Sequence, residues 1–496
     1  MTDSSTHAYT LERGTGFLQR MWYLYHQLGI WSNILVSAEY TNEHGDQLDK
    51  AVILDSLQTV VEAHPALWQV FVKRPSSKKG QHALHTGVLR TIDLEKCVEY
   101  LDDESSVTSD DLERAHNEWL WNSHEPDRPL WKLQVKGRNI IFVYHHSLGD
   151  GMSGMVFHRE FLAALNSHAS TKTKARQSTI LHVKDPAHMP LDPEQVWDGK
   201  DSILELIWTQ LVWLFMTVYY GSARIYGNLP PSKPHLSSAT AIAGPDQRTV
   251  TRISSYRIPA DKMALIIDAC REHQTTFTPL LITMLLIVLA TEFYPDAKVG
   301  ATRYNFDLRP ILPMSQIGGG TINGTFANAA ASWQSWHKLG SVRRVLSSEG
   351  GSSLDAEAVW KLVKDKKDEM TDAISGKGVR NWSGIKRLGT DLEDIVNQAF
   401  PSVSFLLKPT FSVSNIGAFS EIRVGGEKPG PWQIDDLQFS AGAVRGTQGT
   451  HGAIFHVGGV KGGNTTINAT YEDSIVPREM AEGILERTVA RILEVI

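Results

Sequence analysis

The stretch that decides the fold is "IIFVYHHSLGDGMSGMVF", which runs from Ile140 to Phe157. Upstream, "LWKLQV" alternates apolar and polar residues and "KGRN" is typical of a turn, so the two apolar runs predict a β-hairpin that ends at two adjacent histidines. The residues after Gly151 predict a helix, with an inward face made of Met152, Met155, Phe161, Leu162 and Leu165. The histidines and the acidic residue therefore lie on a turn between a strand and a helix, where functional residues are common.

The two histidines and Asp150 suggest acid–base chemistry. Side chains alternate along a strand, so only one of His145 and His146 can face a given cleft. A neutral imidazole there is suited to act as a general base. Asp150 has two possible roles: it either orients the imidazole or forms an ion pair that holds the loop. Gly149 and Gly151 permit tight turning and close backbone approach.

Other interpretations of the motif were weighed. The two histidines can be a structural pair with no chemical role. A zinc site is disfavoured because adjacent histidines have poor geometry for a metal and no Cys or carboxylate cluster completes a ligand set, so we expect no metal. The sequence has no Gly-x-Ser-x-Gly motif, which leaves a serine hydrolase unsupported.

The domain organisation follows from length and composition. A chain of 496 residues is too long for one ordinary core. The segment "GNLPPSKPHLSSATAIAGPD" is dense in Pro, Ser and Gly, which is typical of a linker. We therefore expect a mixed α/β fold of two halves, each combining a mixed sheet with flanking helices. The expected limits are 1–228 for the N-terminal domain, 229–248 for the linker and 249–496 for the C-terminal domain.

The composition excludes some classes of protein. The net charge of -6 and the absence of a basic run give no reason to expect nucleic acid as a partner. The two cysteines, Cys97 and Cys270, cannot form the disulfide framework of a secreted protein, so we expect free thiols. The N-terminal residues lack the apolar core of a signal peptide. We expect a cytoplasmic protein, with association at the endoplasmic reticulum or a lipid-droplet surface as an option.

One segment, residues 203–220, is unusually apolar. It has 18 residues and one charge, Glu205, which is near the lower length for a membrane span. We favour a buried helix, or one that covers an apolar tunnel. The alternative is a helix lying on a membrane or lipid surface. A true span is the least favoured of the three.

The motif "HHSLGDG" at the end of a hairpin resembles the signature of the acyl-CoA-dependent acyltransferases, which include plant BAHD enzymes, fungal alcohol O-acetyltransferases, wax ester synthases and condensation domains. Supporting matches fall in the same order along the chain, namely "LQTVVEAHPALWQVF", "RPLWKL", "NFDLRPILP" and "FSVSNIGAF". The C-terminal Asp-Phe-Gly-Trp-Gly of the plant enzymes is absent. The resemblance therefore favours the fungal alcohol acetyltransferases.

The resemblance implies two chloramphenicol-acetyltransferase-like domains with a solvent channel between them. It makes His146 the general base and His145 a structural residue. It turns Asp150 away from the channel toward an arginine, for which we take Arg309, and it makes Gly151 the residue that gives the loop room.

The implied reaction transfers the acyl group of acyl-CoA, expected to be acetyl-CoA, to the hydroxyl of an apolar acceptor without a covalent enzyme intermediate. An amine acceptor is an option. Candidate contacts to the oxyanion or substrate are Ser412, Ser414 and Asn415, although the same strand can simply be a domain interface. The residues that contact CoA stay unassigned. The alternatives are a long-chain wax-ester or diacylglycerol-type enzyme, a condensation-like enzyme and a non-catalytic binding relative. We expect a monomer.

Overall fold

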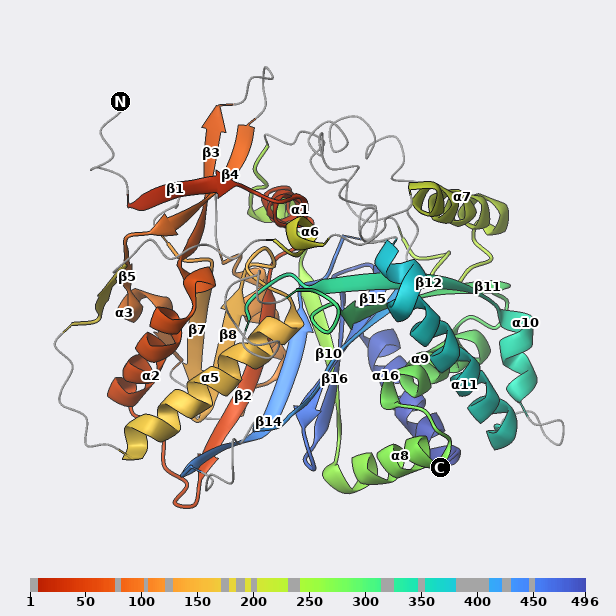
Figure 1. Ribbon diagram of the computed structural model, residues 1–496. Coiled ribbons are helices and arrows are strands. Elements are labelled where there is room, and N and C mark those ends of the chain that lie inside the picture. The colour runs from red at the N-terminus through yellow and green to blue at the C-terminus, as the bar shows by residue number, and fades with distance from the viewer. Residues whose placement is uncertain are drawn as a thin grey trace.

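The computed structural model describes thirteen stretches of the chain: residues 8–75, 82–101, 106–120, 128–170, 178–183, 192–197, 203–230, 241–313, 325–346, 353–380, 410–421, 430–445 and 451–496. Within them the chain forms two lobes, each with its own sheet and its own apolar core (Figure 1). The expected α/β architecture of two mixed halves is therefore present.

The N-terminal lobe is built on a five-stranded sheet. Its strand order is β14 (Trp432–Ala441), β2 (Ile34–Asn42), β8 (Asn139–Tyr144), β7 (Trp131–Lys136) and β6 (Val98–Tyr100). One face is covered by α2 (Lys50–Ala63) and α5 (Gly151–Ser170). α2 starts where the Asp49 carboxylate accepts the backbone N–H groups of Ala51 and Val52. The opposite face packs against α4 (Ser109–Asn117).

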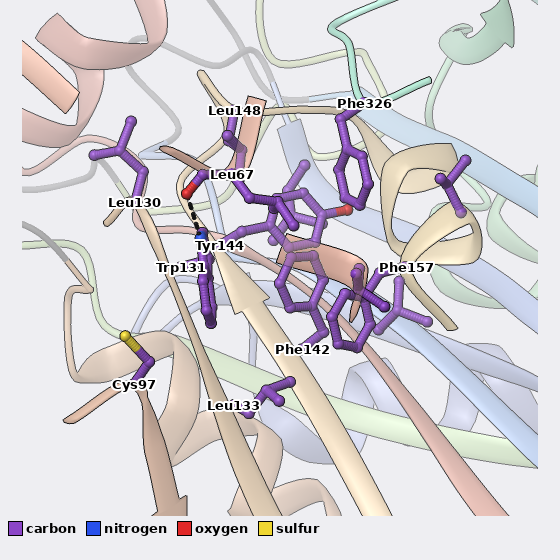
Figure 2. Packing of buried hydrophobic residues seen from close by; sticks show 14 of the residues in the cluster. Leu67, Cys97, Leu130, Trp131, Leu133, Phe142, Tyr144, Leu148, Phe157 and Phe326 are labelled. Carbon is purple, nitrogen blue, oxygen red and sulfur yellow. Dashed lines mark hydrogen bonds between the residues drawn. The ribbon is translucent and has the colours of Figure 1, made fainter. Parts of the chain in front are cut away.

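The expected hairpin is confirmed as β7 and β8, which pair antiparallel around the turn at Gly137. Both strands are almost wholly buried, because the lobe covers both of their faces. Figure 2 shows the core beside them, where Trp131 donates its indole N–H to the carbonyl oxygen of Leu67 at 2.8 Å. The expected helix after Gly151 is also confirmed as α5.

Smaller elements complete the N-terminal lobe. A three-stranded sheet and a two-stranded sheet flank the main one, and short helices join them. The elements are β1 (Tyr9–Gly14), β4 (His82–Leu89), β3 (Gln69–Pro75), β5 (Thr91–Asp93), β9 (Ile180–His182), α1 (Phe17–Gln27), η1 (Pro65–Trp68), α3 (Leu94–Cys97) and α6 (Pro193–Val196). Of these, α1 matters most below, because it supplies the aromatic side chain of Trp22 to the site.

The C-terminal lobe is built on a six-stranded sheet. Its strand order is β10 (Thr251–Ile258), β16 (Thr465–Glu472), β15 (His451–Val460), β13 (Thr410–Phe419), β11 (Val299–Asp307) and β12 (Ala330–Lys338). The helical elements of this half are η2 (Pro245–Gln247), α8 (Ala260–Glu272), α9 (Phe277–Val288), η3 (Leu289–Phe293), α10 (Leu339–Val342), η5 (Arg343–Val345), α11 (Ala356–Asp372), η6 (Ala373–Lys377) and α16 (Arg478–Glu494).

The two faces of the six-stranded sheet differ in chemistry. One face carries Phe411, Val413 and Phe455, which pack into the core of the C-terminal lobe with α9 and α16. Side chains alternate along strands, so the intervening residues point to the other face. In the register of the strands, Ser412 lies beside Arg303 and Ser414 lies beside His456. A polar sheet face is thus placed away from the core of its own lobe.

The chain crosses between lobes after the expected linker. β14 comes from the C-terminal half but pairs antiparallel with β2 of the N-terminal sheet. The side-chain amide of Asn166, on α5, fixes the start of β14: Nδ2 donates to the carbonyl oxygen of Trp432 at 3.0 Å, and Oδ1 accepts its N–H at 2.8 Å. Phe326 also packs into the N-terminal core, as Figure 2 shows. The linker limits at 229–248 stay a prediction. β14 and Phe326 come after this linker in the sequence but pack with the N-terminal lobe.

The apolar segment forms α7 (Ile203–Tyr220), a helix of the expected length at the edge of the molecule (Figure 1). We expected it within the N-terminal domain, but its contacts lie on the C-terminal lobe. Trp213 packs on Trp336 with ring centroids 4.6 Å apart, and Glu205 pairs with Arg380 at 2.8 Å.

The favoured interpretation of α7 as a buried helix is wrong. Trp213 and Thr217 are buried, but Trp208 is 69 % exposed, Tyr219 is 68 % exposed and Phe215 is 61 % exposed. Periodicity cannot separate these cases, because the helix is apolar on nearly every side. Across the described residues no single helix is long and apolar enough to cross a membrane; the pair Ala260–Glu272 and Phe277–Phe293, bent by 99°, meets the length and composition criteria together.

The sequence pattern predicts one strand at the wrong position. The sequence of "AGAVRGTQ", residues 441–448, predicts a strand, but strand pairing ends at Ala441 and residues 442–445 have no regular structure, while residues 446–448 lie outside the described residues. The strand lies earlier, at β14. Its acidic pair Asp435 and Asp436 obscures the apolar alternation, and a register shift occurs there, between Ile434 and Asp436.

Candidate active site

The histidine loop begins where β8 ends, and its first histidine is locked in place. The backbone N–H of His145 donates to the carbonyl oxygen of Leu130 at 2.8 Å. Its buried Nδ1 accepts the backbone N–H of Ser147 at 3.1 Å and lies against the Ser147 hydroxyl. Burial, together with a smaller effect of the neighbouring His146, lowers the pKa of His145 to about 3. His145 is therefore a neutral, structural imidazole.

His146 points elsewhere and is only partly buried. Its ring stacks on Trp22 of α1, with centroids 3.9 Å apart and planes 6° apart. Trp31 meets the same imidazole edge-on, with centroids 4.9 Å apart. The two indoles also contact each other edge-on, at 4.6 Å. They hold the imidazole plane from one face and one edge.

Asn328, from the C-terminal half, binds His146 at two points. Its side-chain nitrogen Nδ2 donates to the carbonyl oxygen of His146 at 2.6 Å. Its oxygen Oδ1 lies 3.1 Å from Nδ1 of the imidazole. Burial lowers the pKa of His146 to about 4, against smaller opposing effects from its own carbonyl, Asp150, Asn328 and Gly149. The imidazole is therefore neutral at neutral pH, as a general base must be.

Asp150 and Arg309 form the ion pair expected from the sequence. Arg309 Nη1 lies 2.9 Å from Oδ2 of Asp150, and Nη2 lies 2.9 Å from Oδ1, which is bidentate geometry. The two side chains are 5 % and 2 % exposed. Asp307 also accepts from Arg309 at 3.0 Å. Asp150 is thus engaged with the arginine and is not bonded to the imidazole of His146.

This ion pair also holds the chain around Asn328. The backbone N–H of Ala329 donates to Asp150 Oδ2 at 2.9 Å, and the carbonyl oxygen of Ala327 accepts from Arg309 Nη2 at 3.0 Å. Ser153 joins the cluster, because its hydroxyl contacts both the carbonyl oxygen and the N–H of Ala327 at 3.2 Å. The residues on either side of Asn328 are therefore fixed by the acidic end of the motif.

The glycines of the motif serve close packing. Neither Gly149 nor Gly151 has a positive φ, so the expected need for a special turn conformation is not what selects them. A Cβ on Gly151 would lie 2.6 Å from Ile416 Cγ2 and 2.8 Å from Phe439 Cζ, both from the C-terminal half. A Cβ on Gly149 would lie 2.3 Å from the Ser153 hydroxyl oxygen. Gly151 gives room to neighbouring side chains rather than to the loop alone.

The three candidates on β13 separate into two groups. Ser412 and Ser414 lie on the polar face, and Ser414 neighbours His456, whose pKa is lowered by burial and, to a smaller degree, by His116 and His146. Asn415 instead donates to the Thr278 hydroxyl on α9 at 2.9 Å and accepts the N–H of Gly417 at 2.7 Å. Asn415 thus faces its own lobe, which corrects its expected place among the substrate contacts.

Sequence reasoning missed Asn328 and the two tryptophans. Asn328 lies in "TFANAA", a segment with no periodicity, and its partner is 182 residues away. Trp22 and Trp31 belong to an aromatic-rich stretch that reads equally well as core. In the part of the chain that the structure describes, no group of three or more His, Cys, Asp and Glu side chains is arranged to hold a metal ion.

A solved structure confirms the fold class. The TRI3 trichothecene 15-O-acetyltransferase from Fusarium sporotrichioides superposes over 99 % of this chain and 98 % of its own, with a TM-score of 0.66 at 11 % identity. At that identity the likeness concerns the fold, which is the two-lobed chloramphenicol-acetyltransferase-like fold of the acyltransferases expected from the histidine motif.

The family is defined by sequence. The alcohol acetyltransferase family model matches residues 14–448, so the chain belongs to this family of acetyltransferases. It is 21 % identical to a probable alcohol acetyltransferase of Fusarium pseudograminearum, FCK4, over 98 % of this chain and 95 % of that one. It is 31 % identical to an uncharacterized protein of Schizosaccharomyces pombe over 40 % of this chain, an alignment that spans 42 % of that protein.

Proposed function

We propose that this protein transfers an acetyl group from acetyl-CoA to the hydroxyl of an apolar acceptor, with His146 as the general base. The observation that carries the proposal is the environment of His146. The imidazole is neutral, Asn328 occupies its Nδ1 side, and His146 as a residue is partly exposed. Family membership supplies the reaction class.

The proposed reaction has two proton transfers and no covalent enzyme intermediate. Nε2 of His146 takes the proton of the acceptor hydroxyl while the oxygen attacks the thioester carbonyl. The tetrahedral intermediate then collapses, the carbon–sulfur bond breaks, and the CoA thiolate takes the proton back from His146. Trp22 and Trp31 fix the ring plane, so the direction of Nε2 is set before the substrate binds.

The oxyanion of that intermediate needs a hydrogen-bond donor. Ser412 and Ser414 are our candidates, since both lie on the polar sheet face and Ser414 neighbours His456. Donors on a strand of the second lobe would approach the thioester from the side opposite the histidine loop.

The test offers the purified protein acetyl-CoA or a long-chain acyl-CoA with a panel of apolar alcohols and amines. Release of the CoA thiol gives the rate, and mass spectrometry identifies the product. We expect an acetyl ester to accumulate faster than any long-chain ester. A faster long-chain ester would replace acetyl transfer by the wax-ester type of reaction. If no ester formed with any of the acyl donors, the proposal would be overturned.

We also propose that α7 rests on a lipid surface and that the protein is a cytoplasmic monomer recruited there. Support comes from the exposed side of α7, where aliphatic residues lie beside Trp208, Phe215 and Tyr219. The one charged side chain of the helix, Glu205, is paired with Arg380. Apolar acceptors concentrate in lipid, so this position would bring the enzyme to its substrate.

Sedimentation with phosphatidylcholine vesicles tests the lipid contact, and light scattering without vesicles tests the monomer. We expect the wild-type protein to sediment with vesicles and a Trp208→Glu, Phe215→Glu, Tyr219→Glu variant to stay in solution. Leu265→Glu, a change at a 57 % exposed site on α8, is the matched control and should sediment like wild type. Equal sedimentation of the triple variant would refute the lipid contact.

A further inference from the structure

We infer that Asn328 is a positioning residue that fixes which nitrogen of His146 carries the hydrogen, and so presents Nε2 as the basic atom. This inference deepens the proposed function and rests on it. Asn328 does not face the reacting atoms; it acts through the imidazole. Its two contacts with His146, at 2.6 Å and 3.1 Å, come from one amide group.

The orientation of the amide determines the hydrogen on the imidazole. The carbonyl oxygen of His146 can only accept, so the Asn328 atom at 2.6 Å from it must be the NH₂ nitrogen. The other end of the amide is then the oxygen, which also can only accept. A hydrogen bond to it at 3.1 Å requires a hydrogen on Nδ1. A neutral imidazole has one N–H, so Nε2 is left with its lone pair.

The rest of the motif keeps Asn328 in this position. Ala329 on one side donates to Asp150, and Ala327 on the other side is bound by Arg309 and Ser153. Asn328 is itself buried. The acidic residue therefore reaches His146 indirectly: it organises the backbone of residues 327–329, and the amide of Asn328 carries that order to the ring. This differs from a triad, in which the carboxylate itself would bind Nδ1.

The hydrogen on Nδ1 matters because Asn328 supplies the side-chain acceptor beside that nitrogen, in addition to the backbone groups of His146 and Gly149 near the ring. Without the Asn328 oxygen, the hydrogen can move to Nε2, and the fraction of His146 able to accept a proton from the substrate falls. The loss appears in turnover, because the substrate would still bind. A carboxylate in place of the amide would keep the acceptor and add a negative charge, which stabilises the protonated imidazole.

The experiment compares Asn328→Leu with Asn328→Asp. We expect Asn328→Leu to lower kcat at least about tenfold with KM within about twofold, since the wrong hydrogen position removes the base but not the binding site. Asn328→Asp should recover most of the lost kcat and should move the acidic limb of the kcat/KM profile to higher pH. A purely structural residue would not produce that shift.

Asn117→Leu is the matched control. Its amide also holds a backbone at two points, donating to the carbonyl oxygen of Thr251 at 3.1 Å and accepting its N–H at 2.8 Å. Losing that clamp should lower Tm to a similar degree as Asn328→Leu, while kcat and the pH profile of the folded protein stay unchanged. A full kcat in Asn328→Leu, or an unmoved acidic limb in Asn328→Asp, would overturn the inference.

A second measurement separates this inference from the proposed reaction. Protein labelled with ¹⁵N-histidine reports the protonated nitrogen of each ring without turnover, and His146→Gln identifies the signal. We expect the Nδ1–H form in the wild-type protein and a mixture in Asn328→Leu. An Nε2–H form in the wild-type protein refutes the inference whatever the substrate is. Failure of acetyl transfer with the Nδ1–H form present refutes the reaction alone.

Discussion

The two ends of the motif differ in how their polar atoms are used. At the acidic end, Asp150 binds Arg309 through both oxygens, and Ser153 and the backbone of Ala329 complete its contacts. At the histidine end, His146 is held through Nδ1 and through one face of its ring, which stacks on Trp22. The polar atoms of the acidic end are engaged by its own contacts, whereas at the histidine end we propose that Nε2 is kept for the substrate. His146 and Asp150 are four residues apart, so one loop carries both the proposed catalytic residue and the ion pair that we expect to stabilise the fold.

This contrast gives the largest expected effect on stability at the acidic end. Arg309→Met leaves Asp150 buried without its charged partner, so we expect the free energy of unfolding to fall by about 3–5 kcal/mol. Denaturant unfolding followed by circular dichroism measures it. Arg271→Met removes an exposed pair with Asp268 and should cost less than about 1 kcal/mol. An equal fall in the free energy of unfolding in the two variants would contradict the expectation that the buried Asp150–Arg309 pair matters more for stability than an exposed pair.

Asp150→Asn probes the same contrast from the other partner. It should lower stability more than it lowers the kcat of the folded protein, because the carboxylate is bonded to Arg309 and to the backbone of Ala329 and not to the imidazole. Wild-type stability with lost turnover would instead make Asp150 a residue that orients the imidazole directly.

The second effect comes from pH. The buried His116, His145 and His456 each have a pKa of about 3, below the ordinary value near 6.5, because burial disfavours their charged forms. The unfolded chain binds more protons than the folded one below pH 6.5, so stability is full above that pH and falls as the pH drops toward 3. The slope is up to about 1.4 kcal/mol per pH unit for each histidine. Thermal unfolding at pH 7.5, 6.5 and 5.5 checks this, and a flat Tm would contradict it.

The third effect tests the close packing at the junction. Gly151→Ala pushes a methyl group against Ile416 and Phe439, and overpacking of this kind costs about 1–3 kcal/mol. In the control Gly340→Ala the new Cβ meets nothing within 4 Å, so stability should hold or rise slightly. Thermal melts of the two variants compare them. A Gly151→Ala protein as stable as wild type would mean that the side chains from the other half yield freely.

The smallest effect concerns β13. Asn415→Ala should leave kcat within about twofold, since Asn415 contacts Thr278 on its own lobe, while Ser414→Ala should lower kcat by more. Steady-state rates with the preferred acceptor decide between them. A larger loss from Asn415→Ala would return that residue to the substrate site.

Local patterns predicted much of this molecule. The hairpin and the helix after it follow from the pattern of apolar, turn and polar residues, whereas the Asp150–Arg309 contact was expected only from the resemblance to the acyltransferases. α7 was predicted as a helix, but its exposure was not, because its composition is apolar on nearly every side and gives no buried face to find. β14 was misplaced since its acidic pair interrupts the alternation.

Contacts between residues far apart in the sequence could not be predicted from local patterns. Asn328 reaches His146 across 182 residues, and neither its neighbours nor its spacing marks it. Trp22 lies in a helix whose aromatic residues read as core. The direction of Asn415 depends on which face of β13 meets α9, and a one-residue change of register would have reversed it. Such facts arise only when distant segments pack together.

The central claim is that Nε2 of His146 removes the proton of the acceptor, and single-site loss of that imidazole tests it most directly. The measurement is kcat for ester formation by His146→Ala and wild-type protein under the same conditions, with Tm recorded for both. The account predicts a loss of about 10²- to 10⁴-fold with Tm nearly unchanged. Ester formation at the wild-type rate by the folded His146→Ala protein would contradict it.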